Sequence, residues 1–189
     1  EASWQKLRAL TEHYKGTIET ALPSGLSLDR KDEIDELSKR VTNDRVCVVY
    51  GESGSGKSAL IKTLLDESFP NAAQVWFGPD TLELALNEAA RTSLGINQPL
   101  VDLLDASPRA DNFLVIDAAE RLGHDSTLKA KALIESLKRR NASEASIGWH
   151  VLIVGQTEAW ARGTLQELAG TASPSNFEVE GLRDETVKD

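Results

Sequence analysis

The sequence predicts an α/β fold, a parallel sheet of five strands with helices on both faces and one further helix ahead of it. Two observations carry this prediction. Apolar runs of strand length alternate with segments of helical period along the chain. The first run, residues 46–50, is apolar throughout and leads into a glycine-rich loop, which is typical of a central strand covered on both faces. With 189 residues, 40% of them hydrophobic, the chain can form one such domain.

Residues 1–25 are predicted to form an N-terminal helix. Apolar residues recur at steps of three and four over residues 3–22, and Pro23-Ser24-Gly25 then interrupts the pattern. This amphipathic helix either packs against the core of the same domain or connects the domain to a preceding one. The remaining residues, 26–189, are assigned to the core domain.

The core domain is predicted to begin with a short extended segment and a helix that ends near residue 41. The predicted strands cover residues 46–50, 73–77, 112–117, 150–155 and 177–182. The predicted helices between them cover residues 59–68, 80–94, 100–104, 127–140 and 157–168. Asp80 and Thr157 are the predicted N-caps of two of these helices.

Composition narrows the functional classes. The formal net charge of −9 argues against a broad electrostatic grip on nucleic acid. No apolar run reaches the length of a membrane span, and no signal-peptide pattern opens the chain. The single cysteine, Cys47, is predicted to be a reduced core residue of a cytoplasmic protein. Because the chain starts at Glu1 and contains no methionine, we expect it to be a piece of a longer protein.

The glycine-rich loop predicts a nucleotide site. It has the Gly-x-x-x-x-Gly-Lys-Ser spacing of a phosphate-binding loop between a strand and a helix. Its amides and the helix start can bind phosphate, and Lys57 can bridge the β- and γ-phosphates. A flexible serine/glycine turn with a chance match is the alternative. The predicted nucleotide-binding residues of this loop are Gly51, Glu52, Ser53, Gly54, Ser55, Gly56, Lys57, Ser58 and Ala59.

A second part of the site is predicted after the third strand. Asp117 follows four apolar residues, and the carboxyl ends of parallel strands face the ligand crevice. We expect Asp117 and the hydroxyl of Ser58 to hold Mg²⁺. The alternative for Asp117 is an ordinary turn or cap at the end of a strand.

Two further residues are candidates for hydrolysis. Glu120, three residues after Asp117, is the predicted catalytic base, with a surface acid at a helix start as the alternative. Gln156, at the end of the fourth strand, is predicted to sense the γ-phosphate or position water. A hydrogen bond at the start of the next helix, with Thr157 as the cap, is the alternative role for Gln156.

These residues together resemble the STAND branch of P-loop ATPases, which is related to the AAA+ ATPases. Residues 28–34 resemble the Gly-Arg-x-x-Glu motif of that branch, with Asp29 in place of the glycine. The resemblance implies that Arg30 lines the adenine end of the pocket. The run from Asp117 to Glu120 is similar to the NACHT-type arrangement, which supports Glu120 as the base. The resemblance to this branch also implies a three-layer α/β/α P-loop NTPase fold with strand order 5-1-4-3-2.

The resemblance also implies a function. Residues 26–30 and 51–60 look most like the bacterial antiphage Avs (AVAST) proteins, in which sensing of a ligand drives ATP-dependent oligomerisation. The chain would then be an ATP-hydrolysing switch that forms homo-oligomers, with effector and sensor domains outside it. Residues 177–185 resemble the last strand and the start of a helical lid, so we expect the chain to stop before that lid.

Three other functions are compatible with a phosphate-binding loop. An AAA+-type motor or loader acting on nucleic acid or protein is the main alternative. A GTPase is disfavoured because no Asn-Lys-x-Asp segment is present to read guanine. A nucleotide-binding scaffold without turnover stays open, because Ala118 stands where many related ATPases have an acid.

Overall fold

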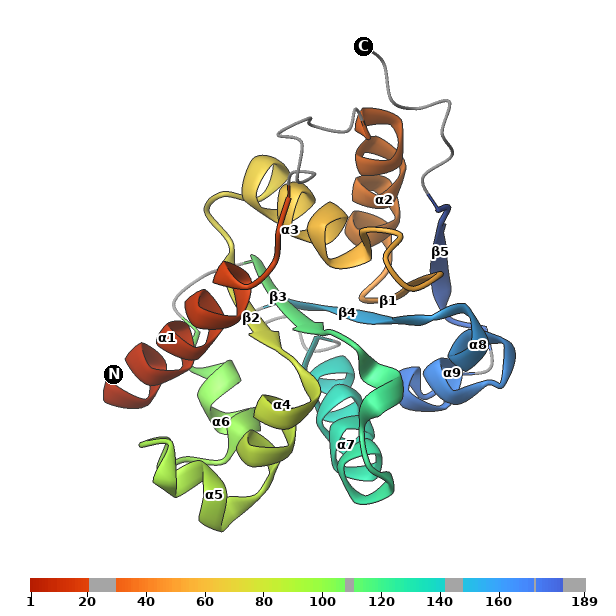
Figure 1. The fold of residues 1–189 in the computed structure, drawn as a ribbon. Coiled ribbons are helices and arrows are strands. Elements are labelled where there is room, and N and C mark those ends of the chain that lie inside the picture. Colours follow the sequence, from red (N-terminus) through yellow and green to blue (C-terminus); the bar gives the residue numbers. More distant parts are fainter. Residues whose placement is uncertain (21–29, 108–110, 142–147, 172, 182–189) are drawn as a thin grey trace.

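The computed structural model describes residues 1–20, 30–107, 111–141, 148–171 and 173–181. Its five strands form one parallel sheet in the order β2-β3-β4-β1-β5 (Figure 1). This order is the predicted one read from the opposite edge, so the predicted fold class is confirmed. The boundary predicted at residues 25 and 26, and the predicted start of a lid after residue 181, lie outside the described residues.

The elements follow one another in α/β alternation. The strands are β1 (Val46–Gly51), β2 (Ala73–Phe77), β3 (Asp111–Ile116), β4 (Gly148–Gln156) and β5 (Ser175–Val179). The longer helices are α1 (Ala2–Gly16), α2 (Lys31–Asn43), α3 (Lys57–Ser68), α4 (Pro79–Leu86) and α7 (His124–Asn141). The shorter helices are α5 (Glu88–Ser93), α6 (Leu100–Asp105), η1 (Ala119–Arg121), α8 (Thr157–Ala161) and α9 (Thr164–Ala169).

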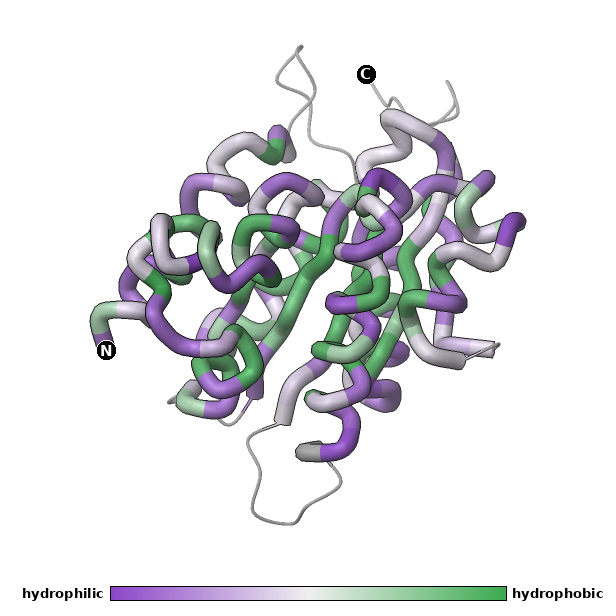
Figure 2. The backbone as a smooth tube through the Cα atoms, turned by 90° about the horizontal axis from the view of Figure 1, so that it is seen from below, coloured by the Kyte–Doolittle hydropathy of each residue, from purple (hydrophilic) through white to green (hydrophobic). Residues whose placement is uncertain are grey.

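The sheet separates two hydrophobic cores. Helices α2 and α3 cover one face, and α4, α6, α7, α8 and α9 cover the other (Figure 1). Side chains of β1 alternate between them, so that Val48 packs in one core and Val49 in the other. All six residues of β1 are buried, which explains its unbroken apolar sequence. Figure 2 shows the hydrophobic segments along the central strands and the hydrophilic ones around the outer helices.

The N-terminal helix α1 packs along the free edge of β2. The hydroxyl of Thr11 accepts a hydrogen bond from the backbone amide of Trp76 at 3.1 Å, so an edge amide of the sheet is satisfied by a side chain. Leu7 belongs to one core, and Tyr14 packs against the other. None of the described helices is long and apolar enough to span a membrane.

Two predicted helices differ from those in the structure. The helix expected over residues 80–94 is divided at Asn87, whose side chain caps α5 by accepting a bond from the amide of Ala90 at 3.2 Å. Asp80 is not the N-cap of α4, because Pro79 is already helical and Gly78 holds the cap position. Thr157 is likewise the first helical residue of α8, since β4 extends to Gln156 and that residue takes the cap position.

A buried histidine on β4 makes stability depend on pH. His150 stacks on Phe113, and its Nε2 lies 3.0 Å from Nη1 of Arg45. Burial, and then the charge of Arg45, lower the pKa of His150 below its ordinary value of 6.5. Below pH 6.5 the His150 side chain of the unfolded chain binds a proton that the folded chain does not bind. The free energy of unfolding should therefore decrease as the pH is lowered.

We expect the melting temperature to drop between pH 7.5 and pH 5.5, and His150→Gln to reduce this drop, because glutamine can accept from Arg45 without titrating. Thermal unfolding at both pH values measures the drop in melting temperature. His13→Gln, at an exposed histidine, is the control. An equal drop in the wild type and His150→Gln would show that His150 is not responsible.

Candidate functional site

The glycine-rich loop leaves the carboxyl end of β1 and enters α3, as predicted. Gly54 and Gly56 have φ angles of +77° and +80°, which favour glycine. A Cβ on Gly51 would lie 2.3 Å from the carbonyl oxygen of Val179, so only glycine fits between β1 and β5 there. A Cβ on Gly54 would meet no atom of the described residues within 4 Å, so a side chain at the tip of the loop would have room. The first turn of α3 follows, with Ser58 and Ala59 half-buried.

The ammonium of Lys57 lies inside the loop. Its Nζ donates to the carbonyl oxygens of Gly51 at 2.9 Å and Glu52 at 2.6 Å, and lies 3.4 Å from Oγ of Ser55. Burial lowers the pKa of Lys57, while the carboxylates of Glu120 and Asp117 act in the opposite direction. The charge is therefore at the centre of the loop and within the field of the predicted base, Glu120, and the predicted metal ligand, Asp117.

Arg30 contacts the backbone of the same loop. Its Nη1 donates to the carbonyl oxygen of Ser55 at 2.9 Å and lies 3.4 Å from that of Gly56. Its Nε and Nη2 donate to both carboxylate oxygens of Glu33, at 2.6 and 2.7 Å. Such a bidentate pair fixes the guanidinium plane. The residues that resemble an arginine motif thus hold the backbone of the loop.

Asp117 follows β3 and is 7% exposed. Each of its carboxylate oxygens accepts one hydrogen bond. The amide of Ala118 donates to Oδ1 at 2.8 Å, and the hydroxyl of Tyr14 donates to Oδ2 at 3.0 Å. Burial and the charge of Asp117 raise the pKa of Tyr14, so the phenol keeps its proton. The apolar period of residues 3–22 marks Tyr14 as part of an amphipathic helix and predicts no role for it at the site.

Glu120 is brought under the end of β4 by a turn after Asp117. Ala118 has φ +49° and ψ +44°, a left-handed conformation that a small residue tolerates better than a bulky one. Glu120 then lies in η1, and its buried Oε2 has no hydrogen-bond partner among the described residues. A Cβ on Gly155 would lie 3.1 Å from this oxygen. An unsatisfied buried carboxylate oxygen costs stability, which is a common signature of a functional group.

Gln156 lies beside the loop. In the β1–β4 register it pairs with Gly51, the first residue of the loop. It is half-buried at the N-cap of α8, without a side-chain cap hydrogen bond. The carboxyl ends of β1, β3 and β4 therefore bring the loop, Asp117, Glu120 and Gln156 to one edge of the sheet.

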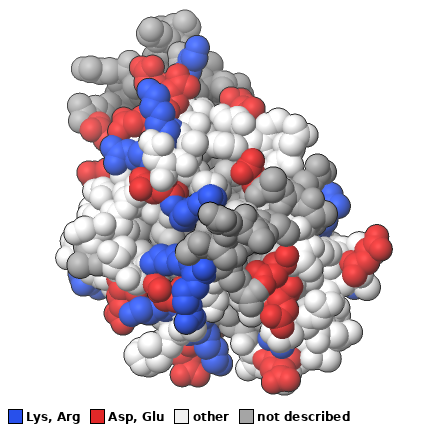
Figure 3. All heavy atoms as spheres, turned by 180° about the vertical axis from the view of Figure 1, so that it is seen from behind, with Lys and Arg blue, Asp and Glu red and all other residues white. Residues whose placement is uncertain are grey.

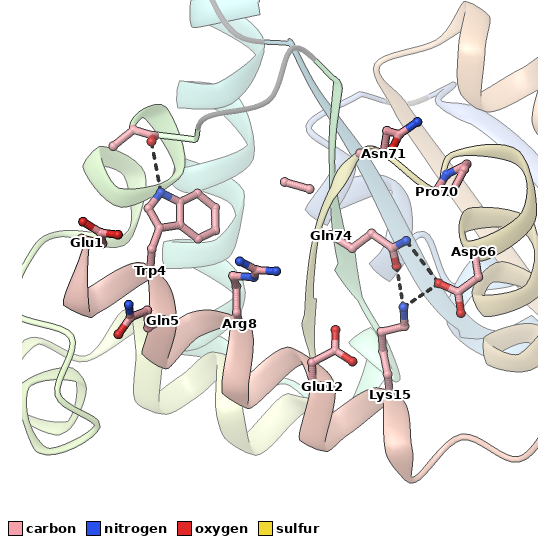
Figure 4. A pocket seen from close by; sticks show the side chains of 13 residues that line it. Glu1, Trp4, Gln5, Arg8, Glu12, Lys15, Asp66, Pro70, Asn71 and Gln74 are labelled. Carbon is pink, nitrogen blue, oxygen red and sulfur yellow. Dashed lines mark hydrogen bonds and ion pairs between the residues drawn. The ribbon is translucent and has the colours of Figure 1, made fainter.

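The described surface has two cavities of note. One of about 300 Å³ borders the loop at Glu52 and continues along the end of β5, at Glu178 and Val179. The other, of about 700 Å³, lies between α1 and the amino end of β2, at the opposite edge of the sheet (Figure 4). The first adjoins the candidate site and the second is separate from it.

The residues present fit a bound Mg²⁺-nucleotide. The loop offers amides, a lysine and a helix start for phosphates, and Ser58 and Asp117 offer oxygen ligands. Mg²⁺ is usually held by one or two carboxylates together with substrate phosphates. Within the described part of the chain, no three His, Cys, Asp or Glu side chains gather as a metal site.

The chain matches one protein family over most of its length. A family model described as an AAA domain matches residues 39–162, which include the loop, Asp117, Glu120 and Gln156. No match was found among curated proteins.

Several solved structures have a similar fold. The Orc1 protein of Aeropyrum pernix, solved in complex with DNA, superposes with a TM-score of 0.59 at 13% identity, over 89% of this chain and 48% of that one. DnaA of Aquifex aeolicus bound to AMPPCP gives 0.56 at 12% identity, over 82% and 46%.

The Walker-type ATPase PABY2304 of Pyrococcus abyssi gives a TM-score of 0.55 at 13% identity, over 89% of this chain and 57% of that one. This chain thus spans about half the length of these proteins. At sequence identities this low, the similarity to these structures shows a shared fold and nothing more. With the family match, they lead to one conclusion: the chain belongs to the AAA domain family and has the P-loop fold of the AAA+ ATPases.

Proposed function

We propose that this chain is the ATP-binding and ATP-hydrolysing switch module of a STAND-type protein. One observation carries the catalytic part of the proposal. A lysine inside a phosphate-binding loop, a buried aspartate and an unpartnered glutamate oxygen converge at the carboxyl edge of one sheet. These are the parts that phosphoryl transfer to water requires.

Each residue has a role in the proposed reaction. The amides of residues 51–59 cradle the phosphates, and Lys57 contacts the β- and γ-phosphates. Ser58 and Asp117 hold Mg²⁺, and the bound ion supplies positive charge that neutralises the phosphates. Glu120 orients the attacking water and accepts its proton. Gln156 contacts the γ-phosphate or positions the attacking water. Arg30 keeps the loop in shape through the carbonyls of Ser55 and Gly56.

The switch role rests on the STAND resemblance. Arg30 and Glu33, two residues of the resembled motif, form a bidentate pair against the loop. Nucleotide binding would thereby be linked to the segment that precedes β1, at the start of α2. In this proposal the longer protein forms homo-oligomers with ATP, slow hydrolysis resets it, and ligand sensing controls an antiphage effector. We place it in the cytoplasm, where the buried thiol of Cys47, whose pKa burial raises to about 11, stays reduced.

A motor or loader on nucleic acid is the second candidate. It is favoured by the similarity to replication proteins, two of which were solved with DNA. The net charge of −9 weighs against it. Figure 3 adds that acidic and basic side chains lie interspersed on the rear face.

Turnover of the full-length protein tests the proposal. We expect AMPPCP to bind in the presence of Mg²⁺, ATP to be hydrolysed slowly, and single- or double-stranded DNA to leave the rate unchanged. A tenfold stimulation by DNA would favour the motor or loader instead. Absence of nucleotide binding with and without Mg²⁺ would overturn the proposed function.

A further inference from the structure

The carboxyl end of α1 reaches the predicted metal-binding aspartate. The Tyr14 hydroxyl donates to Oδ2 of Asp117 at 3.0 Å, although the two residues are 103 positions apart. Gly78, at the end of β2, makes room for the ring, because a Cβ there would lie 2.6 Å from Cε2 of Tyr14. The fold thus has a fitted place for this tyrosine beside the site.

The position of Tyr14 does not depend on its own hydrogen bond. One turn before it, Thr11 is bonded to the amide of Trp76. On its other side, Nζ of Lys15 lies 2.6 Å from the carboxylate of Asp66 and 2.9 Å from Oε1 of Gln74 (Figure 4). Helix α1 therefore holds Tyr14 from both sides.

Helix α1 is also tied to the helix that carries Ser58. Lys62 of α3 donates from Nζ to the backbone carbonyl oxygens of Lys15 at 2.9 Å and Ile18 at 3.1 Å. Ser58 and Lys62 are four residues apart, so they share one face of α3. The end of α1 and the residues after it thus contact Asp117 through Tyr14, and through Lys62 they contact the helix that carries Ser58.

We propose that Tyr14 is a positioning residue of the nucleotide site, whose hydroxyl holds the Asp117 carboxylate in the orientation that binds Mg²⁺. This inference rests on the proposed role of Asp117. A carboxylate has about four acceptor positions, and the hydrogen bonds from Ala118 and Tyr14 occupy two of them. The others stay available to the metal or its water. Helix α1 is thereby a working part of the ATP site.

The opposite arrangement makes the opposite prediction. If the Tyr14 hydroxyl occupied the place of the metal or its water, Mg²⁺ would have to displace it, and its removal would strengthen metal binding. If it orients the carboxylate, its removal weakens metal binding. Loss of a hydrogen bond that orients a metal ligand typically costs about 10- to 100-fold in metal affinity.

Tyr14→Phe in the full-length protein tests the inference, since phenylalanine keeps the ring in place beside Gly78. The probe is Mn²⁺, titrated against the protein with AMPPCP and followed by electron paramagnetic resonance. We expect Mn²⁺ to bind about 10- to 100-fold more weakly than to the wild type. AMPPCP affinity in EDTA should not change, a separation that general damage to the fold would not produce.

The other tyrosine of the chain supplies a matched control. Tyr50 stacks on Trp160, and its hydroxyl lies 3.5 Å from Glu178. Tyr50→Phe therefore removes a hydroxyl without touching Asp117, and we expect wild-type Mn²⁺ binding. If Tyr14→Phe does not fold, as judged by circular dichroism, Tyr14→His, which retains a donor, replaces it and should bind Mn²⁺ more tightly than Tyr14→Ala.

Asp117→Asn separates the two proposals. If Asp117→Asn weakens Mn²⁺ binding but Tyr14→Phe matches the wild type or binds more tightly, Tyr14 is not a positioning residue and the proposed function stands. If Asp117→Asn binds Mn²⁺ as the wild type does, the metal role of Asp117 fails, and the inference about Tyr14 fails with it.

Discussion

Lys57→Ala is expected to weaken ATP binding by roughly 30- to 1,000-fold, which corresponds to about 2–4 kcal/mol for removal of one partner of a partly buried charge pair. The reason is the position of the ammonium, which lies 2.9 Å from the carbonyl oxygen of Gly51 and 2.6 Å from that of Glu52. Its charge is thereby already at the place where the phosphates must lie. Isothermal titration of the full-length protein with AMPPCP and Mg²⁺ measures the effect.

Lys39→Ala is the matched control for this experiment. Lys39 is an exposed lysine of α2, so its removal changes the net charge equally without touching the loop. We expect wild-type affinity from it. If Lys57→Ala also kept wild-type affinity, the glycine-rich loop would not be a phosphate site, and the alternative of a serine/glycine turn would be correct.

The parts of the site that sequence could predict are those with local causes. The loop from Gly51 to Ser58 is specified by glycines at positive φ, a lysine and a strand on its amino side, all close together in the chain. Asp117 and Gln156 are predictable as neighbours because the carboxyl ends of parallel strands meet at one edge. In the structure β3 and β4 are adjacent, and Ile116, just before Asp117, pairs with Ile153 of β4. The strand order followed from resemblance to P-loop proteins, since apolar periodicity alone does not order strands.

Features with non-local causes were missed. The contact of Tyr14 with Asp117 depends on how α1 lies along the edge of β2, and an amphipathic pattern shows only that a helix has a buried face. The close approach of Tyr14 to Gly78 has no signal in the sequence either, because a glycine at that position also suits a turn. The break at Asn87 did have a signal, since asparagine followed by glutamate is a common helix start. The apolar residues on both sides of Asn87 concealed it.

Glu120→Gln is expected to reduce the rate of ATP hydrolysis by about 10²- to 10⁴-fold, the usual contribution of a general base, while ATP affinity is retained. The glutamine keeps the size and position of the side chain but cannot accept a proton from water. Steady-state phosphate release at saturating ATP measures the rate. Asp117→Asn should also lower the rate, but with loss of metal affinity, so the two acids are distinguishable.

The structure predicts the effect of the same substitution on stability. Oε2 of Glu120 is buried and has no hydrogen-bond partner in the part of the chain that the structure describes, and an unsatisfied polar oxygen destabilises the folded state. Removing the charge should therefore leave the melting temperature unchanged or higher. A rate that falls while stability holds or rises identifies a group kept for catalysis at a cost to folding.

Glu158→Gln tests whether position or charge is responsible. Glu158 is an exposed residue of α8 whose carboxylate also acts on Lys57. The variant loses the same charge from the same neighbourhood, and we expect hydrolysis at close to the wild-type rate. If both variants lost activity equally, the effect would come from the electrostatic field around Lys57. If Glu120→Gln alone retained full hydrolysis, the base would have to be another residue, and the left-handed turn at Ala118 would serve only to end β3.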